Sequence, residues 1–257
     1  MSALACVLLA GCATALTPAS RATSTATPAA DTPPAIQPVA CGTGATAFWL
    51  PGPAGGRLEA NSIGSGTVAA VFLHESGGAG MCGFFPYVTW LTAHYPIRAI
   101  LVNRCGYGAS RCSSYPRGDS GTVAQIGPAV EWARAHGATR VALVGSSYGG
   151  GDAVQAAGVV ADVSAVVNLS GAGNDAGVDD SLDAQRLQVP ALFAVAPADR
   201  YCPLSQLQTL YALVPAHPKQ FIVVNELPGT HGWDLLTDVN GQPERLAAVV
   251  ASWILSA

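Results

Sequence analysis

The chain has 257 residues, of which half are hydrophobic and only 11% are charged, and its formal net charge is −4. This length and apolar content suffice for one α/β domain with a well-buried core. The 12 Lys and Arg residues form no basic stripe for a phosphate backbone, so the composition argues against nucleic acid as a partner. We expect chemistry on a small molecule or an acyl group instead.

The first forty residues differ in composition from the rest of the chain. Residues 1–11 hold an apolar run that is too short to span a bilayer and is typical of a signal peptide. The run ends in Leu9-Ala10-Gly11-Cys12, which resembles the lipobox of bacterial lipoproteins. The resemblance implies that Cys12 is lipidated and that the exported protein is anchored to the extracytoplasmic side of a membrane. The alternative is an ordinary apolar segment with a chance cysteine.

Residues 12–40 consist mostly of Ala, Thr, Pro and Ser and carry few charges. Such a segment cannot bury enough apolar area to offset the entropy lost on ordering, so we predict a tether between the anchor and a folded domain over residues 41–257.

Short apolar runs alternate with segments of helical spacing in that domain. The runs are typical of buried strands and lie at residues 68–73, 97–102, 141–144, 165–169, 191–196 and 221–224. The clearest helical segments are residues 123–136, 204–214 and 244–255. Residues 45–50 and 57–63 predict a leading antiparallel hairpin. We therefore predict an α/β fold in which a mostly parallel eight-stranded sheet is flanked by helices on both faces.

The pattern Gly-x-Ser-x-Gly occurs in Gly145-Ser146-Ser147-Tyr148-Gly149, between an apolar run and a stretch of small residues. A serine hydroxyl is a poor nucleophile at neutral pH unless a base can reach it, as on a sharp strand-to-helix turn. Ser147 is the central residue of the pattern, and we predict that it is a nucleophile.

From about residue 45 onward the chain resembles the α/β-hydrolase family, whose members carry a serine, an acid and a histidine in that order. Asp199 follows the strand at 191–196, where many members have the acid. His231 lies in Pro-Gly-Thr-His-Gly after the last strand, where the family places its base. The resemblance implies the α/β-hydrolase fold and a triad of Ser147, Asp199 and His231, with no cofactor and no metal.

Other side chains compete for these roles. Asp199 could instead cap the helix that starts near Pro203. The fallback acids follow the previous strand and are Asp175, Asp179, Asp180 and Asp183. The histidines near predicted helix ends or before a strand have structural explanations, and these are His94, His136 and His217.

Residues 73–78 (LHESGG) follow the strand at 68–73, where relatives carry the loop that helps to bind an oxyanion. The His-Glu pair is similar to the dienelactone-hydrolase branch, which uses a Cys nucleophile. We expect the backbone amides of Ser76 and Tyr148 to form the oxyanion hole, with that of Glu75 as a further candidate. The side chain of Glu75 could pair with Arg104. Residues 103–110 resemble the family's Asp-x-Arg-Gly-x-Gly-x-Ser turn, and we interpret them as structural.

Five cysteines lie within the predicted domain: Cys41, Cys82, Cys105, Cys112 and Cys202. Cys105 and Cys112 belong to one loop and could close it, and the other three could supply a second bridge and one thiol. Because these cysteines lie in loops, a metal site is an alternative to disulfides, but the chain has no Cys-x-x-Cys pair or histidine cluster. We therefore favour disulfides.

Only about twenty residues, 170–189, connect the two strands between which larger family members insert a lid, so we expect no sizeable lid domain. The leading hypothesis is a serine esterase that acts on small-molecule esters. The same triad would also serve an acyl transferase or a peptidase, because the first half-reaction is common to all. A scaffold used only for binding is the non-enzymatic alternative.

Overall fold

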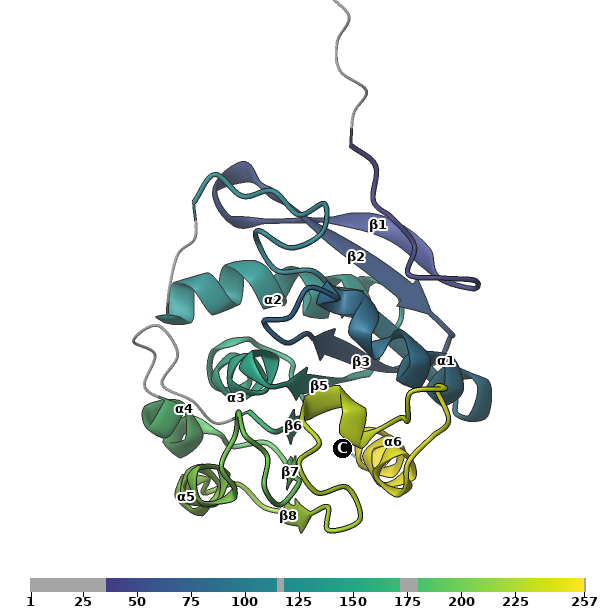
Figure 1. Cartoon of the computed structure of the whole chain (residues 1–257). Helices are drawn as coiled ribbons and strands as arrows, with labels where there is room; N and C mark the ends of the chain where they lie inside the picture. Colours follow the sequence, from purple (N-terminus) through teal and green to yellow (C-terminus); the bar gives the residue numbers. More distant parts are fainter. Residues whose placement is uncertain (1–35, 115–117, 172–179, 257) are drawn as a thin grey trace, which may run out of the picture. The chain divides into compact units, whose positions relative to one another are not determined.

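The computed structural model describes residues 36–114, 118–171 and 180–256. The predicted signal peptide, Cys12 and most of the predicted tether thus lie outside the described residues. The folded unit begins at Ile36 and is built on one eight-stranded sheet with helices on both faces (Figure 1). The predicted α/β architecture is confirmed.

The sheet has the strand order β1-β2-β4-β3-β5-β6-β7-β8. Its strands are β1 (Thr46–Pro51), β2 (Arg57–Ile63), β3 (Val68–Leu73), β4 (Ile97–Val102), β5 (Arg140–Ser146), β6 (Ala165–Leu169), β7 (Ala191–Val195) and β8 (Lys219–Val223). The predicted hairpin is present, because β1 and β2 are antiparallel, and β2 is antiparallel to β4. The remaining six strands are parallel.

Two hydrophobic cores lie on opposite faces of the sheet, as the alternation along β3 requires. Val68, Ala70 and Phe72 belong to one core, whereas Ala69, Val71 and Leu73 belong to the other. The helices on the second face are α2 (Gly118–Ala135), α3 (Tyr148–Val159), α4 (Asp180–Arg186) and α5 (Leu204–Leu213). Those on the first face are α1 (Phe85–His94) and α6 (Arg245–Ser256), and Figure 1 shows the two layers.

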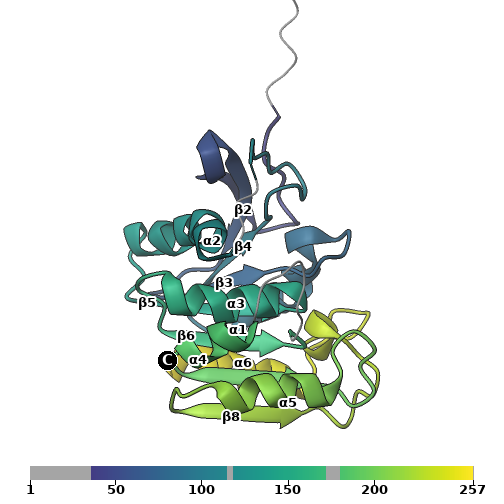
Figure 2. The ribbon, with the colours of Figure 1, turned by 90° about the vertical axis from the view of Figure 1, so that its left-hand side faces the viewer.

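The carboxyl ends of the parallel strands face one edge of the molecule, toward which the arrows of β6 and β8 point in Figure 2. The chain leaves β3 for β4 on one side and returns to β5 on the other, so a topological switch point lies between β3 and β5. Ligands bind at such a point in open α/β sheets, because the loops diverge there.

Two further findings concern the described part of the chain. None of its helices combines the length and the hydropathy that crossing a bilayer would require. Between β6 and β7, where a lid would be inserted, the one element that the structure describes is α4. No large lid is evident there, as the sequence predicts.

The disulfides are Cys41–Cys82 and Cys105–Cys112. The predicted closure of the loop at 105–112 is therefore confirmed. Cys202 is buried and belongs to neither bridge. No group of His, Cys, Asp and Glu side chains in residues 36–114, 118–171 and 180–256 could hold a metal ion.

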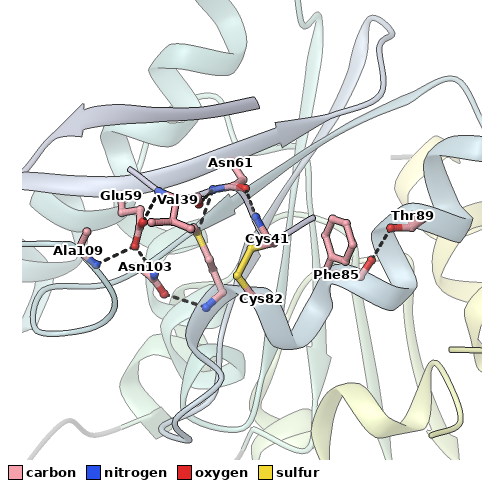
Figure 3. The surroundings of a disulfide bond; sticks show 10 residues. Val39, Cys41, Glu59, Asn61, Cys82, Phe85, Thr89, Asn103 and Ala109 are labelled. Atoms are coloured by element: carbon pink, nitrogen blue, oxygen red, sulfur yellow. Dashed lines mark hydrogen bonds between the residues drawn. A yellow bond between two sulfur atoms is a disulfide. The ribbon is translucent and has the colours of Figure 1, made fainter. Parts of the chain in front are cut away.

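The Cys41–Cys82 disulfide lies beside a buried network of hydrogen bonds (Figure 3). The carboxylate of Glu59 accepts hydrogen bonds from the amides of Val39 (2.7 Å) and Ala109 (2.8 Å) and from the side chain of Asn103 (2.8 Å). The side chain of Asn61 accepts from the Cys41 amide at 2.8 Å and donates to the Val39 carbonyl at 2.9 Å. Three hydrogen bonds from the backbone of Val39 and Cys41 to the side chains of Glu59 and Asn61 thus attach the segment that precedes β1 to β2.

Candidate active site

Ser147 lies on a strained turn between β5 and α3. β5 ends at Ser146 and α3 begins at Tyr148, so Ser147 alone makes the connection. Its backbone has φ 52° and ψ −121°, a conformation that non-glycine residues rarely adopt. Strain of this kind costs about 1–3 kcal/mol and persists where the surrounding structure enforces it, often at functional sites.

The two glycines of the motif make this turn possible. A Cβ atom at Gly145 would lie 1.9 Å from the Gly149 carbonyl oxygen, and one at Gly149 would lie 2.1 Å from the carbonyl oxygen of Leu73. The start of α3 therefore packs directly against the end of β3. The motif brings Ser147 next to the loop that the sequence predicts as part of the oxyanion hole.

Asp199 and His231 contact each other after the ends of β7 and β8. Nδ1 of His231 lies 2.8 Å from Oδ2 and 2.9 Å from Oδ1 of Asp199. The Asp199 side chain is fully buried, and the His231 side chain is 14% exposed. A carboxylate at Nδ1 fixes the tautomer in which Nε2 is the free acceptor and orients the imidazole ring. The sequence prediction that joined these two residues is consistent with this contact.

The ionisation of Asp199 suits a charged partner for the histidine. Burial raises the pKa of Asp199, but the hydrogen bond from His231 and the amides of Cys202 and Tyr201 outweigh burial. The net pKa is below the usual value for Asp. Asp199 is therefore an anion at neutral pH. The ring of Tyr201, which is 78% exposed, lies 5.0 Å from that of His231 at the rim of the site.

Three of the competing side chains that the structure describes have partners elsewhere. Nδ1 of His94, the last residue of α1, and of His136, the residue after α2, bonds the carbonyl of the residue four positions earlier, at 2.8 and 2.7 Å. Among the fallback acids, Asp183 is on α4 and lies 3.8 Å from Arg186. Asp175 and Asp179 lie outside the described residues, and Asp180 is the first residue of α4.

Glu75 connects the nucleophile turn to the histidine loop. Its Oε1 accepts a hydrogen bond from the Ser146 hydroxyl at 2.6 Å and from the Trp233 amide at 3.3 Å. A Cβ atom at Gly232 would lie 1.8 Å from the same oxygen, so the histidine loop touches this carboxyl group. The residues that flank Ser147 and His231 are thus joined through one side chain. The sequence does not predict this role.

Burial raises the pKa of Glu75, and the Ser146 hydroxyl and the His231 charge oppose the shift. The prediction of an ion pair between Glu75 and Arg104 is wrong. Arg104 instead pairs with Asp152 on α3, with Nη1 and Oδ2 2.9 Å apart. The reason is that the Glu75 carboxyl group turns toward Ser146, and only its backbone carbonyl faces Arg104, at 3.3 Å.

The residues predicted to supply oxyanion donors come from two segments that lie side by side. Ser76 is an exposed residue of the loop after β3, and its carbonyl accepts a hydrogen bond from the Tyr107 hydroxyl at 3.0 Å. Tyr148 is the first residue of α3, and its neighbour Gly149 packs against Leu73 and His74. An oxyanion hole between these segments remains a prediction.

No protein-family model matches the chain, and no curated protein is similar to it in sequence. Solved structures do match. The esterase Pf2001 of Pyrococcus furiosus is 10% identical with a TM-score of 0.69, over 82% of this chain and 91% of the esterase. The esterase EaEST of Exiguobacterium antarcticum is 14% identical with a TM-score of 0.65, over 82% and 100% of the two chains.

A third match is the meta-cleavage product hydrolase CumD of Pseudomonas fluorescens IP01. It is 16% identical with a TM-score of 0.65, over 81% of this chain and 97% of CumD. The chain has the α/β-hydrolase fold. The strand order and the strained turn after β5 agree with this assignment, since the fold presents its nucleophile on such a turn.

Proposed function

We propose that this protein is a serine hydrolase that cleaves carboxylic esters through an acyl-enzyme on Ser147. The observation that supports this most strongly is the strained turn at Ser147, which is joined through Glu75 to the loop that holds the hydrogen bond between His231 and the buried Asp199. Each of the three positions has a residue type that is competent for its role. Two of the solved structures with the same fold are esterases, and this supports an ester as the substrate of this protein.

In the first half-reaction, Oγ of Ser147 attacks the ester carbonyl carbon, and Nε2 of His231 takes the hydroxyl proton. The carbonyl π electrons move to oxygen and give a tetrahedral oxyanion. When this collapses, the carbon–oxygen bond to the alcohol breaks, and His231 returns the proton to the leaving oxygen. Asp199 stabilises the imidazolium that forms between these steps and does not take the proton.

In the second half-reaction, water attacks the acyl-enzyme while His231 accepts a proton from it. The second tetrahedral oxyanion collapses by releasing Oγ of Ser147, which regains a proton from the imidazolium. The amides of Ser76 and Tyr148 donate hydrogen bonds to both oxyanions, and the amide of Glu75 is the further candidate. The loss of one such donor costs about 10² to 10³ in rate.

Hydrolysis of p-nitrophenyl esters from acetate to palmitate by the purified full chain tests this proposal. Ser147→Ala should abolish turnover, and Asp199→Asn should lower kcat by about 10⁴ through the wrong histidine tautomer. The matched control is Ser205→Ala at an exposed position on α5, which should leave kcat unchanged. A folded wild-type chain that neither turns over these esters nor reacts with a fluorophosphonate would contradict the proposal. Labelling without ester hydrolysis would favour acyl transfer or peptide cleavage.

The location of the protein is part of the same proposal. Two disulfides are typical of an oxidising compartment and support export. Lipidation at Cys12 would hold the hydrolase on the extracytoplasmic side of the membrane. Metabolic labelling with a fatty-acid analogue should mark the wild-type chain and not Cys12→Ala, and equal labelling of both would exclude Cys12 as the modified residue.

A further inference from the structure

Arg104 lies where the loops after β3, β4 and β5 meet. It is the second residue after β4, and its side chain is only 9% exposed. Nη1 pairs with Asp152 of α3 at 2.9 Å, and Nη2 donates to the carbonyl oxygens of His74 at 3.1 Å and Glu75 at 3.3 Å. One guanidinium group therefore connects the helix that follows Ser147 to the loop that follows β3.

The Glu75 carbonyl that Arg104 binds is half of the peptide unit whose other half is the Ser76 amide. In a trans peptide the C=O and N–H bonds point in opposite directions, so a donor that fixes the carbonyl also fixes the amide hydrogen. A hydrogen bond to the carbonyl also polarises the peptide and makes its N–H a stronger donor. Arg104 thus acts on the amide that we expect to bind the oxyanion.

A second donor reinforces the same carbonyl. Nδ1 of His74 lies 2.5 Å from the Glu75 oxygen, while Nε2 of His74 accepts a hydrogen bond from the Arg104 amide at 3.2 Å. Burial and the Arg104 charge lower the pKa of His74 to about 3, so the ring is neutral with its proton on Nδ1. The loop after β3 is therefore fixed both by the backbone and by the side chain of Arg104.

The flat face of Arg104 contacts the side chain of Tyr148, whose backbone amide is the other predicted donor. Its guanidinium carbon lies 4.0 Å from the centre of the Tyr148 ring and 5.4 Å from that of Tyr107. Tyr107 in turn donates a hydrogen bond to the Ser76 carbonyl. Both residues expected to supply oxyanion donors, Ser76 and Tyr148, are thus held by contacts with Arg104 or with its neighbour Tyr107.

We propose that Arg104 is a positioning residue of the oxyanion hole, which sets the orientation of the Glu75–Ser76 peptide relative to Tyr148. This inference rests on the proposed function. The inference extends the proposed function by assigning a role in the reaction to the turn at residues 103–110, which the sequence suggests is structural. A misplacement of about 1 Å in a catalytic group can cost about 10² in rate, so loss of Arg104 should act on the transition state and not on substrate binding.

Steady-state hydrolysis of p-nitrophenyl acetate by the full chain tests the role. Arg104→Gln should lower kcat by about 10² while KM changes less than about threefold. An alkyl trifluoromethyl ketone adds to the serine hydroxyl as a tetrahedral adduct, and its affinity should fall by the same factor as kcat/KM. The matched control is Arg186→Gln on α4, which removes ion pairs with Asp119 and Asp183 and should leave kcat, KM and the affinity for the ketone unchanged.

Neutralisation of the partly buried Asp152 is the competing explanation for the presence of Arg104. The double variant Arg104→Gln/Asp152→Asn removes both charges, and its stability in urea should recover relative to Arg104→Gln. Its kcat should stay low if Arg104 positions the oxyanion hole. A double variant with wild-type kcat would overturn the inference, and so would a fall in kcat without weaker binding of the ketone. A wild-type chain without Ser147-dependent hydrolysis would instead remove the proposed function, and this inference with it.

Discussion

Removal of the Cys41–Cys82 disulfide should cost more stability than removal of Cys105–Cys112. The first bridge joins residues 41 positions apart and the second joins residues 7 positions apart. The entropy that a cross-link removes from the unfolded chain grows with the logarithm of this separation. At 25 °C it corresponds to about 4 kcal/mol for the long loop and about 2.4 kcal/mol for the short one.

Urea unfolding of two double variants measures this difference. Cys41→Ala/Cys82→Ala and Cys105→Ala/Cys112→Ala remove one bridge each without leaving the partner cysteine of that bridge behind as a thiol. With an m-value of about 2–3 kcal/mol/M, the midpoint should fall by about 1.3–2 M for the first variant and about 0.8–1.2 M for the second. Tryptophan fluorescence and circular dichroism should give the same midpoints if unfolding is two-state.

The contacts around the long bridge add to its expected cost. Without it, the segment at Val39 and Cys41 is held by its hydrogen bonds to Glu59 and Asn61. If the segment detaches, the buried Glu59 carboxylate loses one of three donors, which costs roughly 1 kcal/mol more. Equal losses for the two variants, or a larger loss for Cys105→Ala/Cys112→Ala, would refute the reasoning from loop length.

Three further variants test the packing and the electrostatics of α3. Gly149→Ala would place a Cβ atom 2.1 Å from the Leu73 carbonyl oxygen, so we expect it to lower the free energy of unfolding by more than about 3 kcal/mol. The control is Gly158→Ala, whose Cβ atom would have its nearest contact at 3.4 Å and which should change this free energy by less than about 1 kcal/mol in either direction. Urea unfolding compares the two variants. Burial raises the pKa of Asp152 to about 6 against the effect of Arg104, so the folded state binds this proton more tightly than the unfolded chain does. The contribution of Asp152 to the free energy of unfolding therefore falls by about 3 kcal/mol as the pH rises from about 4 to 6. Asp152→Asn should gain stability by that amount relative to wild type between pH 4 and 7. A stability difference between the two proteins that does not change with pH would contradict the raised pKa.

The fold could be predicted from the sequence because each strand has a local signature. Apart from the edge strand β8, whose residues are partly buried or exposed, the apolar runs are almost entirely buried. All of them fall within one or two residues of the observed strands, as for β3 at Val68–Leu73. The strand order could not be predicted in this way. The placement of β4 between β2 and β3 depends on contacts between segments far apart in the chain, which no local pattern reports.

The candidate site likewise has features that local motifs predict and features that depend on contacts between distant segments. Ser147, Asp199 and His231 each follow a strand in a short motif, and the parallel sheet delivers all such loops to one edge. The sequence predicts part of the cysteine pairing, because Cys105 and Cys112 share a loop, but it leaves the partner of Cys41 open between Cys82 and Cys202. Proximity along the chain limits the pairs that can form, but only the fold selects among distant ones.

The roles of Glu75 and Arg104 show why chemically complementary residues were paired wrongly. Opposite charges on adjacent loops suggest an ion pair, yet the Glu75 carboxyl group bonds Ser146 and the Arg104 guanidinium bonds Asp152. Arg104 binds the backbone carbonyl of Glu75, whereas the side chain of Glu75 bonds the nucleophile turn. A residue at this position can therefore influence the site through its backbone and its side chain on opposite sides of the loop. Replacement of either Glu75 or Arg104 should therefore disturb the contacts of the loop after β3 on both sides.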